Sequence, residues 1–332
     1  MRVLITGAGG FIGSHLVDSQ LEQGHTVRAV DLHLDRLRHQ AASPCLETIH
    51  ADITDHELLK NLVDRMDIVY HLASAHLDVA LSADEYRRVN IEATVALLES
   101  ARRAGVKRFV HCSSVGVIGD VEAPPANETA ECQPTNIYEK TKLEGEKAAM
   151  DFAHRKRFSV VVVRPAWVYG PRCPRTAKLI RTVSKGRFPI FGSGTNLRHP
   201  VYISDAIHGL ELCGSIQNIE GEVFIIAGES PVESRELIHL ISQELNVRMR
   251  KVHLPVFLGR GAGMTLEVLF KLIGRQPPFS RRSMDFFLKH NAYSIAKARQ
   301  RLGYHPQVDL RTGIRETILS MELQGAQVSK YG

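Results

Sequence analysis

The sequence predicts a doubly wound α/β fold, in which a mostly parallel β-sheet is covered by helices on both faces. Three observations support this prediction: short apolar runs alternate with longer segments of helical periodicity, several runs are apolar almost throughout, and the first run leads into a glycine-rich turn. Strands that are apolar throughout are buried on both faces, as in a parallel sheet. Alternation of strands and helices is typical of the α/β class.

The predicted strands recur through the first half of the chain. Helical periodicity is clearest between the last three of them, in Tyr86–Ala104 and Asn136–His154, where apolar residues recur at i, i+3 and i+4. Strand and helix patterns therefore agree on a sheet built from βαβ units. The strands are Arg2–Thr6, His25–Asp31, Leu46–His50, Asp67–Ala73, Lys107–Ser113 and Ser159–Pro165.

The regular alternation of strand and helix patterns ends after Gly170. Residues 170–196 are typical of a helix followed by a loop, residues 197–229 return to helix and strand patterns, and the chain is mostly helical from Ser230 onward. We therefore expect two interleaved domains. The larger one contains the sheet and comprises residues 1–169 with 197–229, and the smaller, mostly helical one comprises residues 170–196 with 230–332.

The bulk composition narrows the classes of function. The chain has 332 residues, of which 44% are hydrophobic, so it can bury a sizeable core. Its net charge of +6 indicates a mildly basic surface suited to an anionic cofactor, and we expect no nucleic-acid partner. Five cysteines without C-x-x-C spacing predict a reduced, cytoplasmic protein. No metal site is expected, because the histidines at 71, 76 and 111 lack ligand spacing.

Two apolar stretches raise the question of membrane targeting. The N-terminal run breaks into glycines and has no small-residue cleavage site, so we do not expect a signal peptide. The stretch Leu254–Gly274 contains Arg260, Glu267 and Lys271, which argues against a transmembrane helix. We expect it to be a core helix of the smaller domain, because buried helices are commoner than lipid-facing ones.

The octapeptide TGAGGFIG, residues 6–13, joins the first predicted strand to the first predicted helix. Gly7 permits the tight turn, Gly10 lets the backbone approach a pyrophosphate, and Gly13 lets the helix pack closely on the strand. The helix N-terminus offers unpaired N–H groups and a positive dipole end to phosphate. Because an acid, Asp31, also ends the second strand, the motif predicts a dinucleotide site.

The residues around Asp31 indicate which dinucleotide binds. Its carboxylate can accept hydrogen bonds from the ribose hydroxyls of NAD and would repel the 2′-phosphate of NADP. Leu32 and His33 follow it instead of arginine, although Arg36 and Arg38 lie close in the sequence. We therefore expect NAD as the cofactor.

The segment YEKTK places Tyr138 and Lys142 four residues apart, on one face of a predicted helix. Free tyrosine titrates near pH ~10, and a neighbouring ammonium group together with a positive nicotinamide ring would favour the phenolate. The pair can therefore act as a general acid–base site. The alternative is an ordinary face of an amphipathic helix.

Together with further motifs, these features resemble the extended short-chain dehydrogenase/reductases of the NAD-dependent epimerase/dehydratase superfamily, over nearly the whole chain. The resemblance implies a Rossmann domain that binds NAD, a smaller domain that binds a small-molecule substrate, and a homodimer. The motifs are the glycine turn, HADITD at 50–55, HLAS at 71–74, VNIEAT at 89–94, CSSVGVIG at 112–119, YEKTK at 138–142 and RPAWVYGPR at 164–172.

The resemblance also implies roles for single residues. Tyr138 would be general base or acid toward the reacting oxygen, Ser114 would hydrogen-bond the same oxygen, and Lys142 would also hold the nicotinamide ribose. Asn90 is a further candidate, for a proton relay or for helix geometry, and Ser113 replaces Ser114 if the motif is shifted by one residue. The cofactor would contact Gly7, Gly10, Phe11, Ile12, Gly13, Asp31, Asp52, Ile53, Leu72, Ala73, Ser74, Tyr138, Lys142 and Pro165.

The motifs leave the substrate open. Val115 and Gly116 follow Ser114 where sugar-nucleotide 4,6-dehydratases carry an Asp-Glu pair, so 4,6-dehydration is not expected. Trp167 stands where nucleotide-sugar enzymes often have asparagine, whereas Arg198 is similar to an arginine that binds the nucleotide diphosphate in many sugar epimerases. The expected substrate contacts are therefore Ser114, Trp167 and Arg198.

The C-terminal stretches 254–282 and 293–318 are similar to the sterol and 3β-hydroxysteroid dehydrogenase branch, in which an apolar helical segment lies near a hydrophobic substrate or membrane. We therefore expect an NAD-dependent oxidoreductase that moves hydride at a secondary alcohol or ketone. One alternative is a nucleotide-sugar 4-epimerase with tightly bound NAD, which Arg198 favours. The other is a non-catalytic NAD-binding sensor, against which the intact Ser114, Tyr138 and Lys142 argue.

Overall fold

The computed structural model describes residues 1–76, 81–250, 252–272 and 284–329. Its centre is a seven-stranded sheet with the order β11-β6-β5-β4-β1-β2-β3, and every neighbouring pair of strands is parallel. The predicted doubly wound α/β fold is therefore confirmed. The strands are β1 Arg2–Thr6, β2 Thr26–Asp31, β3 Leu46–His50, β4 Ile68–His71, β5 Arg108–Cys112, β6 Val160–Pro165 and β11 Val223–Ile226.

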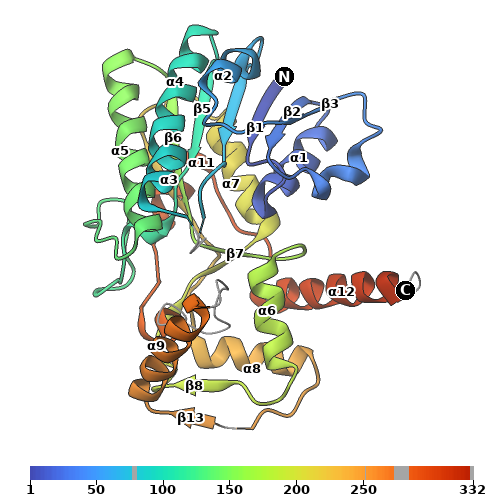
Figure 1. Ribbon diagram of the computed structural model, residues 1–332, viewed down its shortest axis with the longest axis vertical. Coiled ribbons are helices and arrows are strands. Elements are labelled where there is room, and N and C mark those ends of the chain that lie inside the picture. Colours follow the sequence, from blue (N-terminus) through green and yellow to red (C-terminus); the bar gives the residue numbers. More distant parts are fainter. Residues whose placement is uncertain (77–80, 251, 273–283, 330–332) are drawn as a thin grey trace.

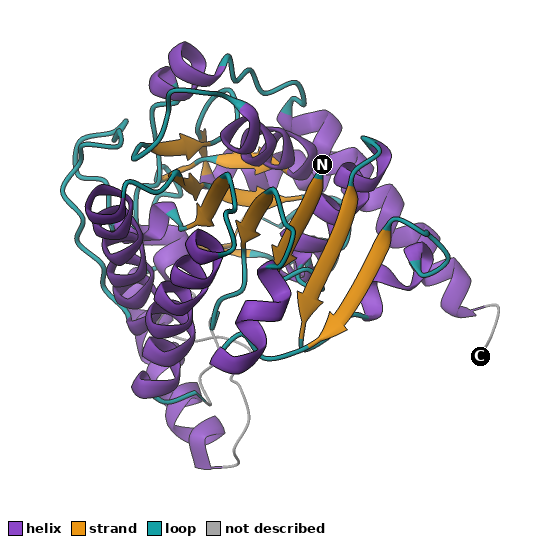
Figure 2. Ribbon diagram, turned by 90° about the horizontal axis from the view of Figure 1, so that it is seen from above, coloured by secondary structure: helices purple, strands orange, loops and turns teal. Residues whose placement is uncertain are grey.

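Helices cover both faces of the sheet (Figure 1, Figure 2). α1 and α7 pack on one face, and α2, α4 and α5 form the layer on the other. Alternate residues of a strand enter different cores: Val3 and Ile5 of β1 pack in the cluster of the α1 and α7 face, whereas Leu4 packs with the opposite layer. These helices are α1 Phe11–Glu22, α2 His56–Val63, α4 Ala93–Arg103, α5 Ile137–Lys156 and α7 Ile203–Ser215.

One predicted helix, Tyr86–Ala104, has an unexpected interruption. α3 (Ala83–Arg87) runs into a π-helical turn, η2 (Arg88–Glu92), before α4 begins. The wider turn moves its backbone toward α5, where a Cβ atom on Gly145 would lie only 2.3 Å from the carbonyl oxygen of Asn90. Apolar periodicity could not reveal this turn, because a π-turn adds a single residue to an otherwise regular pattern.

A second, mostly helical group of elements lies below the sheet in Figure 1 and comes from segments 170–196 and 230–290. α11, although later in the chain, packs on β11 and α7 of the larger unit. The two-domain boundaries stay a prediction. The elements of the lower group are α6 Pro174–Val183, β8 Pro189–Phe191, β12 Val232–Glu233, α8 Ser234–Glu244, β13 Val252–Leu254, α9 Val256–Leu272 and α10 Asp285–Leu288.

The remaining elements connect the two groups and complete the C-terminal region. β7 pairs with β10 in parallel, and β12 pairs with β9 in antiparallel fashion. The elements are η1 Asp35–Gln40, η3 Val115–Val117, β7 Trp167–Tyr169, β9 Leu197–Arg198, β10 Pro200–Tyr202, α11 Ala296–Leu302 and α12 Leu310–Ser329.

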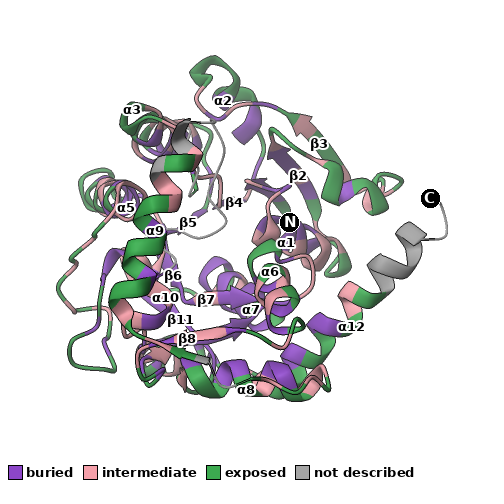
Figure 3. Cartoon of the chain, turned by 60° about the horizontal axis from the view of Figure 1, so that its bottom comes forward, coloured by how far each residue is buried: buried purple, intermediate pink, exposed green. Residues whose placement is uncertain are grey.

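The expectation that Leu254–Gly274 forms a buried core helix is wrong for the residues described. Most of α9 lies on the surface (Figure 3). Its inward face carries Gly259 and Gly263, and a Cβ atom on Gly259 would lie 2.4 Å from the sulfur of Met284. Close packing on glycines leaves larger side chains outside. The exposed apolar ones are Phe257, Leu258, Met264 and Leu269.

Candidate active site

The parallel strands bring most predicted cofactor residues to one edge of the sheet. The strand order reverses between β1 and β4, and ligands of open α/β sheets bind outside the carboxyl ends of the strands at such a reversal. The structure therefore gathers residues that are far apart in the sequence. At these ends lie Gly7 after β1, Asp31 on β2, Asp52 and Ile53 after β3, Leu72, Ala73 and Ser74 after β4, Ser114 after β5 and Pro165 on β6.

The turn between β1 and α1 depends on glycine at its motif positions. Gly7 has a left-handed φ of 73°, and a Cβ atom there would lie 2.6 Å from the amide nitrogen of Ala73. A Cβ atom on Gly13 would lie 2.0 Å from the carbonyl oxygen of Gly7. Around Gly10, by contrast, a Cβ atom would approach only that carbonyl oxygen, at 3.0 Å. The outer side of the turn is therefore open to a phosphate group.

The N-terminus of α1 faces this turn with its backbone donors available. Gly10 is the N-cap, no side chain caps the helix there, and the first turn has no acidic residue. The first N–H groups of a helix lack intrahelical partners and carry the positive end of the dipole. They therefore suit a pyrophosphate. Phe11 and Ile12, the first two residues of α1, pack against the core cluster of this face.

The Asp31 carboxylate is fixed by backbone donors at the end of β2. It accepts hydrogen bonds from the N–H of Gly9 at 3.0 Å and from the N–H of His33 at 2.9 Å. Arg36 lies on the same side, because its Nη1 donates to the carbonyl oxygen of Gly9 at 2.9 Å. Arg38 instead forms an ion pair within its own helix. Of the two arginines in question, only Arg36 is therefore close to the glycine turn.

Two consecutive serines follow β5, and their surroundings differ. Ser113 is buried, and its Oγ donates to Oε2 of Glu146 at 2.6 Å. Ser114 is partly exposed, and its Oγ accepts the N–H of Gly116 at 3.0 Å as the N-cap of η3. That bond leaves the hydroxyl hydrogen of Ser114 for another acceptor. The geometry therefore favours Ser114 over Ser113 as a substrate contact.

Tyr138 and Lys142 lie on successive turns at the start of α5. The Nζ of Lys142 is buried and donates to the carbonyl oxygen of Cys112, at the end of β5, at 2.5 Å. Burial lowers the pKa of Lys142 below its ordinary value, and Cys112 and Glu146 oppose this shift. The ring of His76 meets the Tyr138 ring edge-on, with centroids 4.7 Å apart. The ammonium group is thus fixed one helical turn from the phenol.

Asn90 joins the loop after β4 to α5. Its Oδ1 accepts the N–H of Ala75 at 2.8 Å and the hydroxyl of Ser74 at 3.0 Å. Its Nδ2 donates to the carbonyl oxygen of Ala75 at 3.2 Å and to Oγ1 of Thr141, between Tyr138 and Lys142, at 2.9 Å. Both polar atoms of the amide are therefore engaged, which favours a positioning role over a proton relay through this side chain.

Arg198 is held between aromatic rings near the end of β6. Its guanidinium carbon lies 6.0 Å from the ring centre of Trp167 and 5.1 Å from that of Phe286. With the Asn291 amide oxygen turned toward it, Nη1 donates to that oxygen at 2.5 Å. Burial lowers the pKa of Arg198 to about 10, so it stays protonated at neutral pH. Within the described ranges no carboxylate pairs with it, which leaves the cation suited to an anion.

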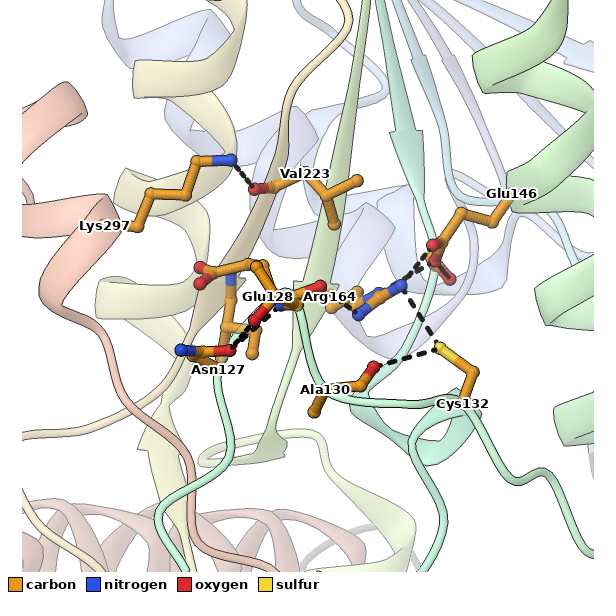
Figure 4. A network of polar contacts seen from close by, with 11 residues as sticks. Asn127, Glu128, Ala130, Cys132, Glu146, Arg164, Val223 and Lys297 are labelled. Atoms are coloured by element: carbon orange, nitrogen blue, oxygen red, sulfur yellow. Dashed lines mark hydrogen bonds and ion pairs between the residues drawn. The ribbon is translucent and has the colours of Figure 1, made fainter.

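A buried ion pair joins Arg164 and Glu146 (Figure 4). Arg164 of β6 and Glu146 of α5 are each 5% exposed, and Nη2 and Nε of the arginine contact the two carboxylate oxygens at 2.5 and 3.0 Å. Nη2 also contacts the sulfur of Cys132 at 3.5 Å. Because Glu146 also accepts a hydrogen bond from Ser113, the residue after β5, the network ties the end of β5 to β6 and α5.

A sequence profile of the NAD dependent epimerase/dehydratase family matches residues 3–227. The chain belongs to this family. It is an NAD-dependent enzyme of the epimerase/dehydratase type, and the resemblance read from its motifs is confirmed.

Relatives within the family differ in their chemistry. The chain is 26% identical to mouse sterol-4-alpha-carboxylate 3-dehydrogenase, decarboxylating, over 96% of the chain and 90% of that relative. It is 31% identical to UDP-glucose 4-epimerase of Mycolicibacterium smegmatis, over 96% of the chain and 97% of that relative. A structure of UDP-glucuronic acid 4-epimerase from Bacillus cereus in complex with NAD has a TM-score of 0.79, with 26% identity over 97% of this chain and 99% of that one.

The residues at the sheet edge fit NAD. The open turn at Gly10 and the uncapped α1 N-terminus suit the pyrophosphate, and the fixed carboxylate of Asp31 suits ribose hydroxyls. The partly buried positions around them can line the adenine and nicotinamide halves. These positions are Phe11, Ile12, Asp52, Leu72, Ala73 and Ser74, whereas Ile53 and Pro165 are buried.

Three nearby residues could not be assigned to the site from their own sequence context. Phe286 and Asn291 reach Arg198 from a segment about ninety positions later in the chain, and neither lies in a motif. Glu139 follows Tyr138, and its Cγ atom lies 3.2 Å from the position that a Cβ atom on Gly116 would take. A carboxylate therefore lies beside η3 although Val115 and Gly116 supply none. Its Oε2 is engaged, since it accepts the N–H of Thr135 at 2.8 Å.

Proposed function

We propose that the chain transfers hydride between NAD and a secondary alcohol or ketone, with Ser114, Tyr138 and Lys142 as catalytic residues. The observation that carries this proposal is the anchoring of Lys142 to the last carbonyl of β5, at 2.5 Å. This contact joins the helix that bears Tyr138 to the strand that leads into Ser114. This connection supports a shared site for the three side chains at the edge where the dinucleotide is expected to bind.

Each side chain has a defined task in oxidation. The substrate carbon gives up hydride while its hydroxyl proton passes to Tyr138 as general base. Ser114 donates a hydrogen bond to the same oxygen, and the Lys142 ammonium favours the phenolate electrostatically. Bound NAD supplies the hydride acceptor. In reduction Tyr138 returns the proton as general acid.

The substrate that we propose first is an apolar secondary alcohol of the 3β-hydroxysteroid type, with the cofactor exchanging at each turnover. Trp167 and Phe286 supply aromatic surface beside the edge, and the rings of these two residues meet at right angles with centroids 6.4 Å apart. Similarity to a sterol dehydrogenase agrees with this choice. The Glu139 carboxylate does not replace a dehydratase acid pair, because Thr135 engages it.

The second candidate is a nucleotide-sugar 4-epimerase, which Arg198 favours. The Nε atom of Arg198 is buried without a hydrogen-bond partner in the described ranges. A guanidinium that pairs with no described carboxylate is suited to the bidentate binding of a diphosphate. The similarity to UDP-glucose 4-epimerase agrees with this reading. An epimerase returns the hydride to the other face of the ketone, so it produces no net NADH.

The proposed site is tested by exchanging its titrating groups. Tyr138→Phe should leave NAD affinity nearly unchanged and lower turnover by roughly 10²–10⁴-fold, the usual contribution of a general acid–base group. Lys142→Met should lower both NAD affinity and turnover, because the lysine is proposed to hold the cofactor as well. Near wild-type turnover in Tyr138→Phe would show that the site is wrongly assigned. Binding of NAD with no turnover of any alcohol, ketone or nucleotide sugar would favour the non-catalytic sensor.

The preference for NAD over NADP is proposed to rest on Asp31. Calorimetric titration of both cofactors tests it, and tighter binding of NADP would show that Arg36 outweighs the aspartate. We also propose a cytoplasmic homodimer, for which light scattering after size-exclusion chromatography gives the mass directly. A monomer at working concentration would contradict that part.

A further inference from the structure

The loop after β4 places an exposed histidine, His76, against the ring of Tyr138. The two rings meet edge to face, with centroids 4.7 Å apart and planes at 81°. Aromatic pairs prefer this arrangement at centroid distances of about 4.5–7 Å, so the contact is at the close end of the range. His76 lies in none of the motifs that identify the site, and the proposed reaction assigns it no task.

The backbone that carries His76 is fixed immediately before the histidine. The N–H of Ala75 donates to Oδ1 of Asn90 at 2.8 Å, and the carbonyl oxygen of Ala75 accepts from Nδ2 of the same amide at 3.2 Å. The hydroxyl of Ser74 also donates to Oδ1 of Asn90, at 3.0 Å. Asn90 is 2% exposed and Ala75 7%, so water does not compete for these bonds. The His76 side chain therefore starts from a defined place, and its two torsions, χ1 and χ2, decide where the ring lies.

Asn90 is also connected to the backbone of Tyr138 by a second route. Its Nδ2 donates to Oγ1 of Thr141 at 2.9 Å, and this oxygen lies 3.1 Å from the carbonyl oxygen of Tyr138, to which it donates. The first route ends at the tyrosine ring, through Ala75 and His76, and the second ends at the tyrosine carbonyl, through Thr141. One buried amide therefore positions both the backbone of the tyrosine and the ring that lies beside its phenol.

We propose that His76 is a positioning residue, whose ring holds the Tyr138 phenol in the orientation that proton transfer requires. The proposal rests on the proposed function, in which Tyr138 exchanges a proton with the reacting oxygen. A general base must lie within hydrogen-bond reach of that oxygen, and the Lys142 ammonium is already fixed at the carbonyl oxygen of Cys112. Rotation of the tyrosine about χ1 and χ2 would take the phenol out of reach, and the neighbouring imidazole opposes this rotation. The contact requires an aromatic ring at position 76 and no ring nitrogen.

Substitution of the histidine in the full chain tests the proposal, with NAD and the substrate that the wild type turns over, a 3β-hydroxysteroid or a UDP-sugar. His76→Ala should lower kcat roughly tenfold or more, since misplacement of a reacting group by about 1 Å can cost about 10²-fold. KM and NAD affinity should change little, because the proposal gives the histidine no contact with substrate or cofactor. His76→Phe should restore most of the wild-type kcat, because a phenyl ring can make the same edge-to-face contact.

The matched control is His208→Ala on α7. His208 is also exposed, and its ring stacks on that of Tyr304 with centroids 6.4 Å apart. This variant removes an exposed histidine from a tyrosine that has no part in the proposed reaction. It should leave kcat unchanged.

NMR spectra of protein labelled at its tyrosines give a readout that does not need turnover. The Tyr138 ring signals, identified by their absence in Tyr138→Phe, should shift in His76→Ala because the neighbouring ring current is lost, and should stay near their wild-type positions in His76→Phe. Unshifted signals or wild-type kcat in His76→Ala, or a His76→Phe variant as slow as His76→Ala, would each overturn the proposal. A raised KM with unchanged kcat would also overturn it, by making His76 a substrate contact. A wild-type protein that turns over neither substrate would instead refute the proposed function, and with it the role of His76.

Discussion

Replacing Glu146 by glutamine should destabilise the protein strongly although the two side chains have nearly the same shape. The carboxylate is 5% exposed, accepts two bonds from Arg164 and accepts a third from Ser113 at 2.6 Å. The amide leaves the buried guanidinium without a counter-charge. Loss of one partner of a buried ion pair typically costs about 3–5 kcal/mol of unfolding free energy.

Glu144→Gln is the matched control on the same helix. Glu144 pairs with Arg87 at 2.7 Å, but the two side chains are 41% and 50% exposed, and exposed pairs contribute about 0–1 kcal/mol. Unfolding in urea can be followed by fluorescence, because Trp167 is the single tryptophan of the chain. We expect the midpoint to fall clearly in Glu146→Gln and little in the control.

A double variant distinguishes loss of the pair from general disruption. In Glu146→Gln/Arg164→Met no buried charge remains without its partner, so stability should recover by about 1 kcal/mol or more relative to Glu146→Gln alone. A stability loss in Glu146→Gln no larger than that in Glu144→Gln would contradict a stabilising role of the pair. A double variant that loses more stability than the two single variants together would contradict it as well.

Three further results follow from the site. Ser114→Ala should lower turnover with little change in stability. Ser113→Ala should instead lower stability by about 1–3 kcal/mol, because the buried Glu146 carboxylate loses a hydrogen-bond donor. The reverse pattern would assign the catalytic serine to position 113. In a binding titration, Arg198→Met should weaken the binding of a nucleotide sugar by about 1.5–3 kcal/mol and leave the binding of an uncharged alcohol nearly unchanged. Equal weakening for both ligands would contradict an anion site. Burial holds the pKa of His111 well below 6.5, so as the pH falls below 6.5 the unfolded chain gains a proton that the folded chain excludes. Between pH ~7 and ~5, denaturant titrations should therefore show that His111→Leu loses roughly 2 kcal/mol less unfolding free energy than the wild type. Identical dependence of stability on pH in the two proteins would refute this.

Local sequence patterns sufficed for the parts of the fold that depend on local chemistry. Strands buried on both faces are apolar throughout, so the six predicted ones are present with ends that differ by at most two residues. The glycine turn could be interpreted because its requirements are local: Gly7 has a left-handed φ, and a Cβ atom on Gly13 would meet the backbone of Gly7 and Ala8. Tyr138 and Lys142 share a helix face because their spacing requires it.

Long-range contacts account for what the sequence could not predict. The π-turn at Asn90 is set by packing against Gly145 of another helix, and Phe286 joins Arg198 only through tertiary structure. The sequence of α9 is equally apolar whether its large side chains pack in a core or lie on the surface. In the structure the buried glycines occupy the inward face, so the large side chains lie on the surface. The choice between Ser113 and Ser114 likewise needed the position of Glu146.

The proposed reaction is net hydride transfer to an exchanging cofactor at the site of Ser114, Tyr138 and Lys142. The most direct measurement follows NADH absorbance and substrate composition together when the protein is given NAD with either 3β-hydroxysteroids or UDP-sugars. With a secondary alcohol, NADH should form in the same amount as the ketone product, and Tyr138→Phe should lose this signal. Interconversion of a UDP-sugar with its 4-epimer without released NADH would contradict it.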